Sequence, residues 1–192
     1  MKRGVSEKTK KLTLGALLAA MGTVLLLLGA LIETLDLTMA ALASFFCIFA
    51  VIELGGAYPW LIYAVTSILS VVLVPQGMGG WFYLLFFGYY PIIKEKTERL
   101  KKPISVILKI LIFNGALILG VAISYFLFFA QREGVNALDA VILFFGGEGA
   151  GKIIAAFMYL LSNVVFLLYD LALTRMISFY FIKLRHRLKF LR

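Results

Sequence analysis

A cluster of charges in the middle of the chain most constrains how the chain can fold. Residues 94–103 hold five Lys or Arg side chains, and apolar sequence runs up to the cluster from Trp81 and leaves it from Ile104 to Phe129. Such a segment cannot lie in hydrocarbon, and short loops rich in Lys and Arg stay on the cytoplasmic side of a membrane. We therefore interpret it as a cytoplasmic loop between two membrane spans.

Both ends of the chain are basic as well. The cations of the two ends are Lys2, Arg3, Lys8, Lys10 and Lys11, and then Lys183, Arg185, Arg187, Lys189 and Arg192. Three basic clusters on one side of a membrane require an even number of crossings between neighbouring clusters. The chain is 62% hydrophobic and 15% charged, whereas soluble domains are about half apolar and a quarter charged. The sequence therefore predicts a membrane protein.

Apolar runs predict an all-α membrane protein, a single bundle of six transmembrane helices with both termini in the cytoplasm. The first run has 21 residues without a charge and would be about 31 Å long as a helix. The fourth is short and must borrow flanking residues or lie where the bilayer is thinned. The predicted spans cover residues 12–32, 37–52, 60–74, 81–93, 104–129 and 153–173, and a basic cytoplasmic extension follows at 174–192.

Several functional classes are disfavoured by the sequence. The net charge of +9 lies at span ends, where it sets orientation and meets anionic lipid, so we expect no nucleic-acid partner. Cys47 is the single cysteine and His186 the single histidine, which predicts neither a metal site nor a cofactor. Residues 146–152 fit the core of a phosphate-binding loop, but Ile153 stands where Ser or Thr would hold magnesium. We therefore expect no enzyme.

Polar residues inside predicted spans are few. Asp170 is the one acid well inside a span, and we interpret it as a structural contact between helices rather than as a catalyst. Intramembrane polar groups face the bundle interior or a cavity. The remaining polar residues therefore either form hydrogen bonds with a neighbouring helix or line a pocket. We hypothesise a substrate site in the outer half, beneath the 130–152 loop and the 33–36 turn, between the last three spans. Its candidate residues are Glu33, Trp81, Tyr83, Asn114, Tyr125, Glu148, Tyr159 and Asn163.

Small residues form two neighbouring stripes on the first predicted span. Such stripes let another helix approach closely in a membrane, where lipid removes the hydrophobic drive for association. The helix that approaches can belong to this chain's own bundle or to a partner membrane protein. The candidate docking residues are Gly15, Ala16, Ala19 and Ala20.

In this layout the chain resembles the substrate-binding S components of energy-coupling-factor (ECF) transporters. The length, the six predicted spans and the two cytoplasmic ends all agree with that family. In S components the first helix carries an Ala-x-x-x-Ala face toward the transmembrane coupling subunit, and Ala16-Leu-Leu-Ala-Ala20 stands in the matching place after Lys10-Lys11-Leu-Thr-Leu. The stretch from Leu85 to Lys94 also looks like the inner end of the fourth span in some clostridial-type S components.

The resemblance implies a multi-pass protein in the plasma membrane of a bacterium. It would capture a vitamin or related micronutrient from outside and deliver it inward with the coupling subunit and a pair of cytoplasmic ATPases. The alternative is a non-catalytic six-span scaffold or assembly protein, which would need no ligand pocket. A membrane enzyme is the third and least favoured class.

Overall fold

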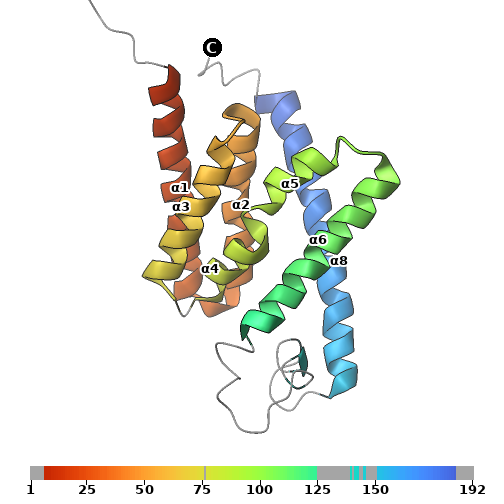
Figure 1. Ribbon diagram of the computed structural model, residues 1–192. Coiled ribbons are helices and arrows are strands. Elements are labelled where there is room, and N and C mark those ends of the chain that lie inside the picture. Colours follow the sequence, from red (N-terminus) through yellow and green to blue (C-terminus); the bar gives the residue numbers. More distant parts are fainter. Residues whose placement is uncertain are drawn as a thin grey trace, which may run out of the picture. The chain divides into compact units, whose positions relative to one another are not determined.

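The described chain folds into helices. The structure is a computed structural model that describes residues 7–75, 77–124, 139, 141–142, 145 and 151–184. No strand occurs among these residues. The elements in Figure 1 are α1 (Glu7–Leu31), the 3-10 turn η1 (Glu33–Leu35), α2 (Asp36–Glu53), α3 (Tyr58–Leu73), α4 (Met78–Phe82), the π-helical turn η2 (Tyr83–Phe87), α5 (Tyr90–Thr97), α6 (Lys102–Ser124), α8 (Lys152–Phe179) and the π-helical turn η4 (Tyr180–Leu184).

Four helical segments are long and apolar enough to cross a membrane. They are Glu7–Leu31, Asp36–Glu53, Lys102–Ile123 and Lys152–Ile182. They coincide with the first, second, fifth and sixth predicted spans, except that residues 125–129 lie outside the described part of the chain. The third predicted span corresponds to α3, which is apolar but shorter. These helices are compatible with a membrane-embedded protein, and the count of six spans stays a prediction.

Residues 81–93, the fourth predicted span, do not form one continuous α-helix. The segment is divided between the end of α4, the π-helical turn η2 and the start of α5, with two turn residues at 88–89. Proline at the second position of α5 is one cause, since a proline ring is tolerated only in the first turn of a helix.

The C-terminal helix is longer than its predicted span. The sequence predicts a span over residues 153–173 and a basic extension after it. In the structure α8 runs to Phe179 and η4 to Leu184. The helix thus continues into the basic C-terminal extension.

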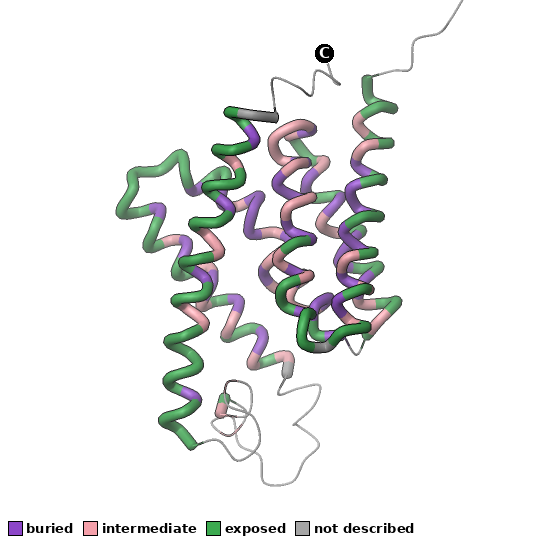
Figure 2. The backbone as a smooth tube through the Cα atoms, turned by 180° about the vertical axis from the view of Figure 1, so that it is seen from behind, coloured by how far each residue is buried: buried purple, intermediate pink, exposed green. Residues whose placement is uncertain are grey.

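The chain divides into two compact units. The first comprises residues 1–101 with 175–192, and the second comprises residues 102–174. In Figure 2 buried positions form stripes along the helices of the first unit, whereas α8 is largely exposed along its length. A wide exposed surface of Leu, Ile, Val and Phe side chains is what lipid would cover.

Glycines on α1 allow close packing in the first unit. A Cβ atom at Gly22 would lie 3.2 Å from the Cγ2 atom of Thr66 on α3, and one at Gly29 would lie 2.9 Å from the Cβ atom of Met39 on α2. Ala19 is buried in a cluster whose other members are Leu18, Ala50, Leu54 and Ile62. One of the two small-residue stripes is therefore used for packing within the chain.

The helices of the first unit alternate in direction, so their ends gather in two groups. Gly55 and Gly56 make the turn between α2 and α3 with φ values of +60° and +59°, a conformation that glycine adopts without a steric penalty. The Tyr180 hydroxyl donates to the Glu53 carboxylate beside this turn. The start of α1 and the end of η4 lie at this end, and the turn η1 with α4 lies at the other (Figure 1).

Tyr63 on α3 stabilises the irregular turn η2. The Gly88 amide donates to the Tyr83 carbonyl at 2.8 Å, five residues back, which is the π-helical pattern. The Tyr63 hydroxyl donates to the Leu84 carbonyl at 2.8 Å, which satisfies a backbone group that the irregular turn displaces. A Cβ atom at Gly88 would lie 2.5 Å from the Tyr63 ring, so only glycine fits beneath the ring.

Removing the Tyr63 hydroxyl should destabilise the first unit. We expect Tyr63→Phe to lower the free energy of unfolding by about 1–3 kcal/mol, because the Leu84 carbonyl loses its donor inside an apolar environment. Tyr58→Phe is the matched control, since the Tyr58 hydroxyl makes no hydrogen bond to the described residues. Unfolding in mixed detergent micelles measures both, and equal stability of the two variants would contradict this role.

Candidate functional site

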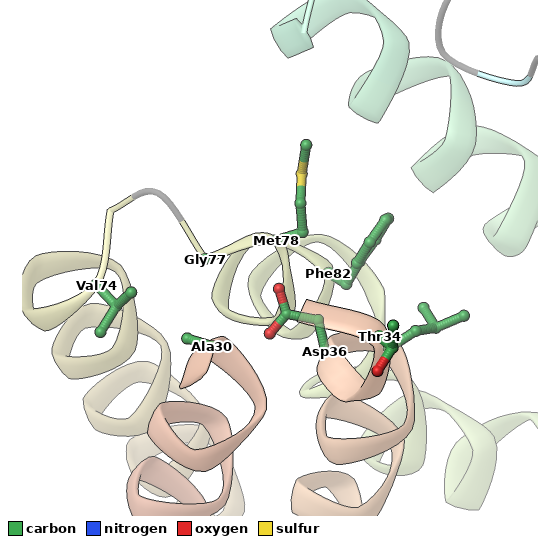
Figure 3. A pocket seen from close by; sticks show the side chains of 8 residues that line it. Ala30, Thr34, Asp36, Val74, Gly77, Met78 and Phe82 are labelled. Atoms are coloured by element: carbon green, nitrogen blue, oxygen red, sulfur yellow. The ribbon is translucent and has the colours of Figure 1, made fainter. Parts of the chain in front are cut away.

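A pocket opens where α1 and α3 end and α2 and α4 begin. It is an open pocket of about 460 Å³, and small-molecule sites usually measure about 300–1,000 Å³. Figure 3 shows the side chains around it. Its lining residues are Ala30, Thr34, Asp36, Leu37, Val74, Gly77, Met78 and Phe82. We refer to it as the α1–α4 pocket.

Glycines bring the short helix α4 close to its neighbours at this pocket. A Cβ atom at Gly77 would lie 2.9 Å from the Cβ atom of Ala30. A Cβ atom at Gly80 would lie 3.2 Å from the Ser70 hydroxyl on α3. The glycine-rich segment therefore allows the backbone of α4 to approach α1 and α3 more closely than larger residues would permit. This close approach forms one wall of the pocket.

Asp36 is the charged residue of the pocket lining. It is the first residue of α2 and is 9% exposed, and the positive end of the helix dipole favours a carboxylate there. Its Oδ1 atom is buried without a hydrogen-bond partner. Cβ atoms at Gly29 and Gly79 would lie 3.2 and 2.9 Å from that oxygen, so both glycines leave room for the carboxylate.

In the second unit a polar cluster joins α6 and α8. The Asn114 amide nitrogen donates to the Asn163 side-chain oxygen at 3.1 Å and to the Ile110 carbonyl at 2.9 Å. The Tyr159 hydroxyl donates to the Asn114 side-chain oxygen. Both N–H groups of Asn114 and its oxygen therefore have partners within the helix pair, and these groups satisfy one another.

An ion pair lies on the same two helices. The Lys109 ammonium is 3.1 Å from the Asp170 carboxylate, and the two side chains are 10% and 18% exposed. Between the pair and the asparagines, the Phe113 and Phe166 rings stack with centroids 4.4 Å apart. Asp170 thus makes the contact between helices that was expected for it.

The predicted substrate-site residues that the structure describes belong to both units of the chain. Asn114, Tyr159 and Asn163 meet in the second unit, as described above. In the first unit Trp81 donates its indole N–H to the Pro75 carbonyl at 3.0 Å. Tyr83 is 1% exposed in an apolar cluster with Leu26, Ala40 and Ala43. Glu33 lies in η1 and its side chain is not described, and Tyr125 and Glu148 lie outside the described residues.

The predicted docking residues divide between two faces of α1. Gly15 and Ala19 are buried, and Gly15 faces Ile62, whose Cδ1 atom would lie 3.6 Å from an added Cβ. Ala16 and Ala20 are exposed. Gly15 and Ala19 therefore pack inside the chain, whereas Ala16 and Ala20 lie on the surface of the described structure.

Sequence reasoning missed Asp36 as a site residue. The sequence assigns Asp36 to the turn that follows the first predicted span, and residues in such a turn are normally exposed to water. The signal that could have found it is the glycine-rich segment at 77–80, since close approach of a second backbone can bury an acid at a helix start. The pairing of the two segments is a tertiary contact that neither shows alone.

Among the described residues no group of three His, Cys, Asp or Glu side chains could hold a metal ion. The α1–α4 pocket instead offers one carboxylate and one hydroxyl among side chains that are otherwise apolar, and a few polar groups of this kind can orient a small molecule. Comparisons of the chain with protein families, curated proteins and solved structures find no match.

Breaking the Lys109–Asp170 pair on one side should be costly. We expect Lys109→Met to lower the free energy of unfolding by about 3–5 kcal/mol, because Asp170 is left as an unpaired charge. The double variant Lys109→Met with Asp170→Leu should recover most of this loss. Lys152→Met, at an exposed cation that begins α8, is the control. Additive losses in the double variant would show that the two side chains do not interact.

Proposed function

We propose that the chain is the membrane-embedded substrate-binding subunit of an ECF-type importer. It captures a vitamin or related micronutrient from outside the cell and passes it inward together with a coupling subunit and ATPases. The observation that carries the proposal is the α1–α4 pocket, formed at the end of the first unit opposite the start of α1. The positive-inside rule assigns the basic ends to the cytoplasm, so this pocket faces outward.

The free stripe on α1 supports the proposed partner. Ala16 and Ala20 are exposed, although the neighbouring Gly15 and Ala19 already satisfy the packing of α1 within the chain. A second membrane helix could approach this small-residue face closely enough for van der Waals contact along its length. That is the surface on which a coupling subunit would dock.

The scaffold function is the second candidate, favoured by the exposed helices of the second unit. Ile153, Leu160 and Leu168 of α8 are 86%, 63% and 60% exposed. Partner helices could cover this surface as well as lipid could. The pocket with its buried acid has no purpose in a pure scaffold, and for that reason we prefer the importer subunit.

The orientation can be tested by labelling introduced cysteines in intact cells. We expect Thr34→Cys, beside the pocket, to react with a membrane-impermeant thiol reagent, and Glu98→Cys, in the central basic cluster, to be protected. The natural Cys47 is fully buried, so the parent protein supplies the background. The reverse labelling would place the pocket in the cytoplasm and overturn capture from outside.

The docking face can be tested by enlarging its side chains. Ala16→Leu with Ala20→Leu should reduce recovery of the coupling subunit about tenfold, equivalent to losing about 1.4 kcal/mol of contact. Stability of the isolated protein should change little, because both positions are exposed.

Leu17→Phe with Met21→Phe enlarges a neighbouring exposed stripe of the same helix and serves as the control. Equal recovery from both double variants would contradict docking through Ala16 and Ala20. Unfolding of the alanine variant would assign the stripe to internal packing.

A further inference from the structure

We propose that the α1–α4 pocket binds a small organic cation and that the Asp36 carboxylate holds its ammonium group. The inference rests on the proposed function, since it names the chemical class of the substrate. Three features of the described structure carry it: a buried acid without a partner, glycines that make room for that acid, and a pocket whose lining side chains other than Asp36 and Thr34 are apolar.

The acid needs a positive partner that the described residues do not supply. Asp36 is about nine-tenths buried, its Oδ1 atom has no hydrogen bond, and no described Lys or Arg makes an ion pair with it. An unpaired buried charge is unfavourable. A bound ammonium group in the pocket would supply the opposite charge to the carboxylate, whereas an anionic ligand would be repelled.

The surroundings of Asp36 are arranged around its carboxylate. Gly79 on α4 and Gly29 on α1 stand where any side chain would press on Oδ1. Figure 3 shows the carboxylate between Ala30 and the segment with Gly77 and Met78, where it faces the pocket. The dipole at the start of α2 offsets part of the cost of burying a negative charge there.

The rest of the lining selects an organic body over a bare metal ion. Leu37, Val74, Met78 and Phe82 offer apolar surface, and Thr34 adds a single hydroxyl. A volume of about 460 Å³ is far larger than one ion requires. A ligand with an apolar or aromatic body and one cationic end matches both parts of the pocket.

The test is calorimetric titration of the purified full-length protein with matched amines and alcohols. Tryptamine and tryptophol share a ring and a chain and differ in the terminal ammonium or hydroxyl, and phenethylamine with phenethyl alcohol forms a smaller pair. We expect each amine to bind about 10–100-fold more tightly than its alcohol, as a hydrogen-bonded charge should. Equal binding within the pairs, or no saturable binding of any amine, overturns the inference.

Two variants assign the effect to the carboxylate. Asp36→Asn keeps the shape and should abolish the preference for amines, while Glu95→Gln, an acid on α5 that pairs with Arg99, should keep it. Gly79→Ala should weaken amine binding by pressing on Oδ1. Without ligand, Asp36→Asn should unfold at the same temperature as the parent protein or higher, and only the parent should gain thermal stability from the amine. A preference that survives Asp36→Asn contradicts the inference.

Co-purification of the coupling subunit with the chain distinguishes a failure of this inference from a failure of the proposed function. Recovery of the subunit with no preference for amines would leave the importer proposal standing and remove only the cationic substrate. Preferential amine binding by a protein that recruits no coupling subunit would support the pocket assignment and contradict the importer.

Discussion

The first unit depends on how closely α1 can approach α2 and α3. In a membrane, apolar side chains gain little by leaving lipid for one another, so helices associate through close packing and a few hydrogen bonds. Gly22 and Gly29 permit that approach, and the Thr66 hydroxyl donates to the Ala19 carbonyl at 3.4 Å across the contact. Larger residues here would separate the helices whose ends form the pocket.

Long apolar runs predicted α1, α2, α6 and α8, because a run without charges has few alternatives to a helix in lipid. The segment at 81–93 was less predictable. Its apolar sequence is interrupted by Gly88 and Pro91, and the π-helical turn η2 depends on a hydrogen bond from Tyr63, twenty-one residues before Leu84. Such an irregularity is decided by a tertiary partner rather than by the local sequence.

The candidate site was less accessible to sequence reasoning than the helices. The sequence identified the polar groups at Asn114, Tyr159 and Asn163, but it could not show that they bond to each other. It identified the turn before α2, but not that Gly79 lies against the Oδ1 atom of Asp36. Which polar groups pair and which remain unpaired depends on contacts between distant segments.

The ion pair between α6 and α8 bears on the order in which the chain is made. Lys109 leaves the ribosome before Asp170 is synthesised, because α6 precedes α8 in the sequence. During that interval the lysine has no carboxylate to neutralise it, and a lone charge opposes entry of a helix into hydrocarbon. We therefore expect the two helices to enter a membrane together, after the last helix of the second unit has been synthesised.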